Sequence, residues 1–259
     1  SRDGLTSWQH QAWAFDKEES GYPAGVQVWW PLDEASGSAI TDVISGTDMT
    51  AGGSYSRNQT SLNANNAATS FSGGRGVRAS VPGWVYGGDR SMSMSFWMAH
   101  SGDFSEPIQS VLADARAMDG SSDYNYQFLV HVFDSGARIR LFWEYGTGTN
   151  ESVLLDLPVS FDITEPHHYV VVRDTAAKSV KLYIDGAEEA SGTYAENPTG
   201  STTFEWVLAA QQDDVSTYTY PLSATLQDVS LYNRPLTLAD VELLYNSGDG
   251  VDHTNPTGA

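Results

Sequence analysis

Carboxylates are the side chains best placed to do chemistry in this sequence, which holds 33 Asp and Glu against 13 Lys and Arg. Hydrolysis of a glycosidic bond needs two carboxyl groups flanking the bond, one protonated and one ionised. Glu188 and Glu189 are adjacent in the sequence, so on a strand they would point to opposite faces. Glu144 and Glu205 have no acidic partner at strand spacing. The carboxylates therefore do not predict a glycoside hydrolase.

The sequence does not support nucleophilic or metal-dependent catalysis either. The sequence has no Cys and no Gly-x-Ser-x-Gly, the motif that exposes a nucleophilic serine on a strained turn. Its six His are scattered, and no pair has metal-ligand spacing with a nearby carboxylate. The glycine-rich stretch 73–76 lacks the Lys-Ser/Thr of a phosphate-binding loop. We therefore predict that the protein is not an enzyme.

Charge and composition exclude further classes. The formal net charge is −20, which argues against a surface that neutralises nucleic-acid phosphates or anionic lipids. No apolar run approaches the roughly 20 residues that a membrane helix needs, so we expect no membrane insertion. With 259 residues, 40% of them apolar and 12% aromatic, the chain can build one large domain or two small ones around a sizeable core.

Short segments with alternating apolar and polar residues predict an all-β protein, a two-sheet antiparallel β-sandwich with one short helix near the C-terminus. In Ser91–Met98 the methionines and Phe96 fall on one face and the serines on the other. Arg138–Tyr145 and Val180–Ile184 alternate in the same way. Asp185-Gly186 then predicts a type I′ hairpin turn.

The helix is predicted from its capping residues. Thr237 is a good N-cap, and Asp240 three residues later completes a capping box. Gly248 is the expected C-terminal stop. The expected apolar stripe comprises Leu238, Val241, Leu244 and Tyr245. Residues Thr6–Glu19 form a weaker helical candidate, because an extended segment would present the same aromatic residues.

We divide the chain into three zones. Residues 1–25 form an N-terminal extension, 26–247 one β domain, and 248–259 a C-terminal tail. The extension carries Trp8, Trp13 and Phe15. Exposed aromatic residues need cover, so this zone is a candidate strap that binds a neighbouring subunit.

The β domain resembles the laminin-G-like, concanavalin A-like lectin and glucanase jelly-roll family over about residues 26–247. The resemblance rests on stretches in the family's order. They are Trp29-Trp30-Pro31-Leu32-Asp33-Glu34-Ala35-Ser36-Gly37, Phe71-Ser72-Gly73, Ser93-Met94-Ser95-Phe96-Trp97, His167–Asp174 with Val180–Gly186, and Leu226–Leu236. It implies two antiparallel sheets packed face to face, with the first and last strands of the domain adjacent.

The resemblance also implies one possible cofactor, a structural Ca²⁺ between the opening loop and the closing strand. Ca²⁺ prefers six to eight oxygen ligands. The matching positions are Asp42, carbonyl groups near Gly46 and Asp48, and Asp228. The alternative is that these aspartates hold turns together by accepting hydrogen bonds from backbone amides.

Lectin-like relatives bind sugars through aromatic rings that stack on the sugar face. Each candidate aromatic residue has an alternative role as an ordinary loop residue packed on the sandwich. The candidates are Trp84, Tyr86, Tyr124, Tyr126, Tyr218 and Tyr220.

The leading functional hypothesis is a non-catalytic recognition or adhesion module that binds a glycan or a protein surface. The first alternative is a structural subunit of a virion, such as a phage fibre, tail or capsid decoration, or of a surface filament, anchored through residues 1–25. The second alternative is a glycoside hydrolase, which the missing carboxylate pair disfavours. The first two hypotheses place the protein outside the cell, on a cell surface or on a virion surface.

Overall fold

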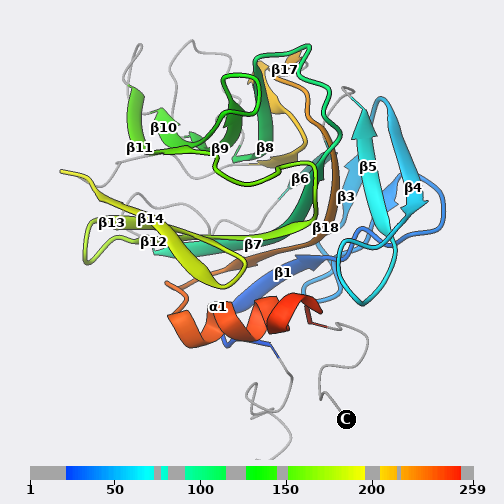
Figure 1. Cartoon of the computed structure of the whole chain (residues 1–259). Helices are drawn as coiled ribbons and strands as arrows, with labels where there is room; N and C mark the ends of the chain where they lie inside the picture. The colour runs from blue at the N-terminus through cyan, green and yellow to red at the C-terminus, as the bar shows by residue number, and fades with distance from the viewer. Residues whose placement is uncertain are drawn as a thin grey trace, which may run out of the picture.

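The chain folds into two eight-stranded antiparallel sheets packed face to face, as Figure 1 shows. The structure is a computed structural model. It describes residues 22–72, 77–80, 91–114, 127–144, 151–195, 205–214 and 217–251. The predicted all-β sandwich is therefore confirmed. Among these residues no helix has the length and apolar character to cross a membrane.

The strand order defines the two sheets. Sheet A runs β14 (Ala187–Thr193), β13 (Ser179–Ile184), β12 (His167–Asp174), β7 (Met92–His100), β18 (Ser223–Tyr232), β5 (Ala68–Ser72) and β4 (Tyr55–Gln59), with β1 (Val26–Trp30) also paired to β18. Sheet B runs β11 (Glu151–Pro158), β10 (Arg138–Glu144), β9 (Gln127–Phe133), β8 (Ile108–Asp114), β15 (Glu205–Leu208), β6 (Val77–Ser80), β3 (Met49–Ala51) and β2 (Ala39–Ile40). A hairpin of β16 (Gln211–Asp214) and β17 (Thr217–Thr219) forms a third, small sheet.

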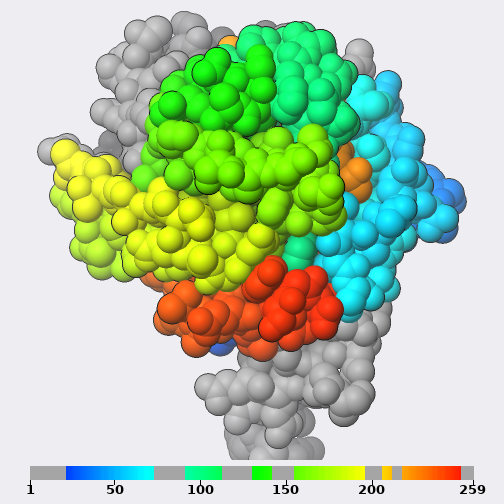
Figure 2. Space-filling model, viewed as in Figure 1, coloured from blue at the N-terminus to red at the C-terminus, as the bar shows by residue number. Residues whose placement is uncertain are grey.

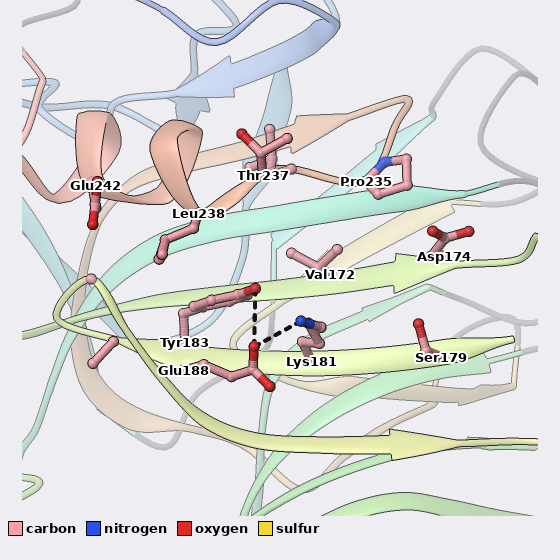
Figure 3. A pocket seen from close by; sticks show the side chains of 13 residues that line it. Val172, Asp174, Ser179, Lys181, Tyr183, Glu188, Pro235, Thr237, Leu238 and Glu242 are labelled. Carbon is pink, nitrogen blue, oxygen red and sulfur yellow. Dashed lines mark hydrogen bonds and ion pairs between the residues drawn. The ribbon is translucent and has the colours of Figure 1, made fainter. Parts of the chain in front are cut away.

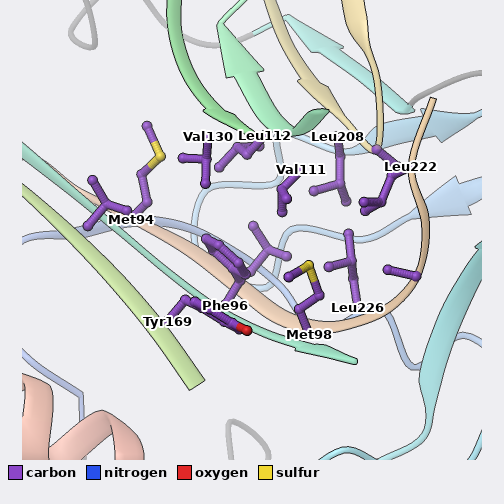
Figure 4. Close-up of a cluster of buried hydrophobic side chains, with 14 of the residues drawn as sticks. Met94, Phe96, Met98, Val111, Leu112, Val130, Tyr169, Leu208, Leu222 and Leu226 are labelled. Atoms are coloured by element: carbon purple, nitrogen blue, oxygen red, sulfur yellow. The ribbon is translucent and has the colours of Figure 1, made fainter. Parts of the chain in front are cut away.

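The main core lies between the two sheets. Met94, Phe96 and Met98 of β7 point into it, and Tyr169 of β12 stacks on Phe96 with ring centroids 5.3 Å apart. Figure 4 shows these side chains opposite Leu112 and other apolar residues of sheet B. The alternation read from the sequence therefore sets which face of each strand enters the core.

A second apolar layer covers the outer face of sheet A. It includes Trp29 of β1, Val172 of β12 and Tyr183 of β13, which pack with Val241 and Leu244 of helix α1 (Leu238–Tyr245). Figure 1 shows α1 on the side of sheet A that faces away from sheet B. Because α1 covers this face, the central strands β7, β12 and β18 of sheet A are buried on both sides.

The serines of β7 lie under this layer, not in water. The Ser93 hydroxyl donates to the Arg234 carbonyl over 2.9 Å and accepts from the Leu236 amide over 3.0 Å. The Ser95 hydroxyl lies 2.8 Å from Nε2 of the buried His168. These bonds fix the chain that leads into α1, and they satisfy polar groups that burial would otherwise make costly.

Helix α1 begins as predicted and ends earlier. Thr237 is its N-cap, and the capping box with Asp240 is present. The C-cap is Asn246 at φ 47°, in the left-handed conformation, while Gly248 ends a short 3-10 turn, η2 (Asn246–Gly248). Leu238 does not belong to the buried stripe, because it is 50% exposed. The predicted helix at Thr6–Glu19 lies outside the described residues.

Two predictions, one about a hairpin turn and one about strand pairing, are confirmed. Asp185 and Gly186 have φ of 50° and 83° and join β13 to β14, as a type I′ turn requires. The first strand of the domain, β1, pairs with the last, β18, with Trp30 opposite Val229. This pairing brings the opening loop of the domain against its closing strand.

The helix layer predicts a contrast between two leucines of α1. Leu244→Ala should lower the free energy of unfolding by about 2–5 kcal/mol, because it leaves a cavity under the helix. Leu243→Ala should change it by less than about 0.5 kcal/mol, because Leu243 is 45% exposed. Urea unfolding followed by tryptophan fluorescence measures both. Equal losses would show that α1 does not cover sheet A.

Candidate functional site

A row of polar side chains crosses the outer face of sheet B. Ser110 of β8 lies opposite His131 of β9, His131 opposite Arg140 of β10, and Arg140 opposite Asp156 of β11. Directly opposed residues of an antiparallel pair point to the same face. Their neighbours Val130, Ile139 and Leu141 belong to the core, so the row faces away from it. We call these four residues, with Tyr220 beside them, the sheet B row.

Two arginines bind the one carboxylate of the row. Nε of Arg138 lies 2.5 Å from Oδ1 of Asp156, and an Nη of Arg140 lies 2.9 Å from Oδ2. The bond from Arg138, reinforced by Arg140, lowers the pKa of Asp156 below its usual value. The side chains of these three residues remain between 23% and 33% exposed. The group carries one net positive charge at the surface of a chain whose total charge is −20.

Aromatic rings border these charges. The Arg140 guanidinium lies 3.7 Å from the centroid of the Phe133 ring, within the range of a cation–π contact. Tyr220 is 37% exposed and lies beside His131, with ring centroids 5.8 Å apart. His131 itself is buried, and burial lowers its pKa to about 3 despite a hydrogen bond with Gln211. The imidazole is therefore neutral at physiological pH.

This arrangement suits binding better than catalysis. Planar guanidinium and carboxylate groups form directional hydrogen bonds with hydroxyl and carboxylate groups. Aromatic side chains add apolar contact with a polar group at their edge. Within the described part of the chain, Oγ of Ser110 and Nε of Arg140 are buried without a hydrogen-bond partner. Such buried polar atoms are rare in folded proteins.

The structure places two of the aromatic residues predicted to bind a ligand over the outer face of sheet B. Tyr220 lies beside His131, and Tyr218 packs against Val207 and Ala210. Val207 alternates with the core residues Trp206 and Leu208 of β15, so it faces away from the core. The other candidates, Trp84, Tyr86, Tyr124 and Tyr126, lie outside the described residues, as do Trp8, Trp13 and Phe15 of the predicted strap. Trp84 and Tyr86 follow β6 in the sequence, and Tyr124 and Tyr126 follow β8. The last residues of these two strands lie at one end of sheet B, because Ser80 pairs with Glu205 and Asp114 with Trp206.

The predicted calcium ligand Asp42 is fully engaged in hydrogen bonds. Its Oδ1 accepts the amides of Trp29 and Ile44 over 2.9 and 3.0 Å. Its Oδ2 accepts the amides of Ser45 and Thr47 over 3.1 and 3.0 Å, and the Ser45 hydroxyl as well. Both oxygens therefore organise the opening loop, as the alternative reading of this residue expects.

The other predicted ligands also contribute to this bonding. Asp48 accepts the Asp42 amide over 2.9 Å. Asp228 accepts the Trp29 indole over 3.2 Å and the Asn63 amide group over 2.8 Å. Gly46 lies in the same loop at φ 73°. Among the described residues no three His, Asp or Glu side chains are grouped as a metal site. These bonds agree with the alternative, in which the aspartates hold the loop together, and calcium binding stays a prediction.

A separate cavity lies between α1 and strands β12–β14. Its volume is about 510 Å³, and its lining includes Val172, Lys181, Glu188, Leu238 and Glu242. Figure 3 shows α1 along one side and the strands along the other. In Figure 2 the yellow β14 and the orange α1 lie next to each other on the surface. We call this cavity the helix groove.

The family of the chain can now be stated. A family model described as the concanavalin A-like lectin/glucanases superfamily matches residues 71–242. The chain belongs to this superfamily, and the resemblance inferred from the motifs is confirmed. The opening motif at Trp29–Gly37 lies before the matched region.

Solved structures share the fold at low sequence identity. The binding domain of Paraclostridial mosquitocidal protein 1 aligns with a TM-score of 0.61 and 14% identity, over 86% of this chain and 52% of that one. The receptor binding domain of botulinum neurotoxin C/D mosaic serotype gives 0.60 and 13%, over 86% and 51%. Trypanosoma rangeli sialidase in complex with sialic acid gives 0.58 and 15%, over 88% and 33%.

These likenesses establish the fold. The chain spans about a third to a half of the proteins that it resembles. A search of the curated proteins found no match to the sequence.

The sequence predicts only part of the sheet B row. The alternation in Arg138–Tyr145 places Arg138 and Arg140 on the polar face. Asp156 and His131 have no such signal, because only the pairing register brings them opposite Arg140.

The bonding of Asp42 predicts stability that does not depend on calcium. The Tm of the protein should be the same in CaCl₂ and in EDTA, whereas Asp42→Ala should lower it equally in both, because several charge-assisted hydrogen bonds are lost. Differential scanning calorimetry measures both effects. A rise in Tm with CaCl₂ that Asp228→Asn abolishes would establish a calcium site instead.

Burial of His131 predicts a pH dependence of stability. The folded protein keeps His131 neutral down to about pH 3, whereas the unfolded chain takes up the proton near pH 6.5. Stability from this group is therefore lost as the pH falls, by about 2 kcal/mol between pH 7 and 5. The unfolding free energy of His131→Gln, measured by urea titration, should lack this component. Parallel pH curves for the two proteins would show that His131 is solvated.

Proposed function

We propose that this protein is a non-catalytic recognition module that binds a glycan or a protein surface through the outer face of sheet B. The sheet B row carries this proposal. It combines an exposed aromatic ring at Tyr220 with the charged groups of Arg140 and Asp156 on one sheet face. Ser110 and His131 of the row are buried, so the groups that a ligand would meet are Tyr220 and the partly exposed Arg138, Arg140 and Asp156.

The row is poorly suited to glycoside hydrolysis. In most glycoside hydrolases that reaction uses a protonated and an ionised carboxyl group facing each other across the bond. The row holds one carboxylate, Asp156, and two arginines lower its pKa. A carboxyl group held ionised in this way cannot serve as the general acid. We therefore propose binding without turnover.

The similar structures support recognition as the function. Two of them are titled as binding or receptor binding domains of toxins, and a third is a sialidase described with bound sialic acid. The superfamily itself includes lectins and glucanases. A ligand on a receptor or a glycan would place this protein outside the cell, on a cell surface or on a virion. Attachment to an assembly through residues 1–25 remains a further prediction.

A glycan array tests the proposal. The full chain should bind one class of glycan, and Tyr220→Ala should weaken that binding by about two- to twelvefold, the effect of losing one aromatic contact of about 0.5–1.5 kcal/mol. Leu243→Ala is the control, because Leu243 lies on α1 on the other side of the sandwich. Binding constants come from titration calorimetry with the glycan selected on the array.

Two results would contradict the proposal. Release of new reducing ends from the bound glycan would show that the module is an enzyme. Equal binding by Tyr220→Ala and the wild-type protein would move the ligand to another surface.

A further inference from the structure

The helix groove is a second surface with the features of a binding site. It lies outside sheet A, so it is separate from the sheet B row. Its floor includes Val172 of β12 and Tyr183 of β13, which are both buried. One wall is α1, whose Leu238 is 50% exposed at the groove although leucine is usually buried.

The charges of the groove are mostly negative. Glu188 is neutralised by Lys181 over 2.7 Å, and the Tyr183 hydroxyl lies 3.4 Å from the same carboxylate oxygen. Two other carboxylates of the lining, Asp174 and Glu242, have no ion-pair partner among the described residues. Figure 3 shows them at opposite ends of the cavity, with the Lys181–Glu188 pair between them. The groove therefore has an acidic group at each end and a mutually neutralised ion pair between them.

This pattern fits an extended segment whose basic side chains are separated by apolar ones. A basic side chain can then reach the acidic group at each end of the groove. The aliphatic stems of Lys and Arg can lie on apolar surface while their charged heads reach a carboxylate. Leu238, Val172 and Pro235 offer such a surface within the groove. A cavity of about 510 Å³ has room for a few side chains.

Charge argues against residues 1–21, residues 252–259 and a second copy of the chain as the occupant. Residues 1–21 contain two basic and four acidic residues, and residues 252–259 contain one acidic residue and no Lys or Arg. A second copy would bring a net charge of −20. Each of these would place like charges together, which costs free energy.

We propose that the helix groove docks an extended cationic segment of a different protein. Its basic side chains pair with Glu242 and Asp174, and its apolar side chains cover Leu238. The module would then join two partners, one on the face of sheet B and one beside α1. This inference does not depend on the glycan-binding proposal, because the two surfaces share no residue.

Fluorescence anisotropy with labelled peptides tests the groove. The probe is Gly-Lys-Leu-Lys-Leu-Arg-Gly, and the matched peptides carry Gln or Glu in place of every basic residue. The full chain should bind the basic peptide at least about tenfold more tightly than the Gln peptide, and binding of the Glu peptide should be undetectable. Higher salt should weaken the binding.

Paired variants separate the groove from general attraction to an acidic protein. Glu242→Gln should weaken binding of the basic peptide by about two- to fivefold. Glu106→Gln should leave it unchanged, because Glu106 is an exposed acid next to sheet B. Leu238→Ala should weaken it by about fivefold, while Leu243→Ala should not. Lys181→Gln should tighten it, because the Glu188 carboxylate becomes free to pair with the peptide.

Three outcomes would overturn the proposal. Equal effects within each matched pair would show that the peptide binds anywhere on the acidic surface. Weaker binding by Lys181→Gln would show that the Lys181–Glu188 pair supports the groove and does not compete with the peptide. Self-association in sedimentation velocity that Leu238→Ala abolishes would make a second copy the occupant.

Discussion

Burial of the central strands of sheet A on both faces is the constraint on which the rest of the structure depends. Trp29 and Trp30 are neighbours in β1, yet Trp30 enters the core between the sheets and Trp29 enters the layer under α1. Both indoles are fully buried, so the strand cannot shift by one residue without exchanging them. Because α1 packs on the outer face of sheet A, the partly exposed charged groups of the sheet B row lie on the other side of the sandwich.

The polar groups of the opening loop secure this arrangement. Asp42 holds the backbone amide of Trp29, and Asp228 holds its indole. The two carboxylates thus fix one tryptophan from the loop between β2 and β3 and from the closing strand β18. Buried hydrogen bonds to ionised groups are among the stronger ones in proteins. An acidic cluster that resembles a metal site in the sequence is therefore explained by the position of one side chain.

The fold could be predicted from the sequence, whereas the candidate site could be predicted only in part. Alternation in β7 and the Asp185-Gly186 turn are local signals, and they were sufficient to predict the core-facing side of that strand and the hairpin between β13 and β14. The burial of Ser93 under the chain to α1 had no local signal, because a serine facing a helix layer looks like one facing water. The sheet B row depends on pairing between β9, β10 and β11, which separate segments of sequence do not reveal.

The central claim is that the ligand binds on the outer face of sheet B, and the imidazole signals of His131 and His168 test it most directly. His131 belongs to the sheet B row, whereas His168 is buried on the α1 side, close to Tyr245. In a ¹H–¹³C NMR titration with the glycan selected on the array, the His131 signal should shift while the His168 signal stays in place. A shift of His168 alone, or of neither signal under saturating glycan, would contradict the account.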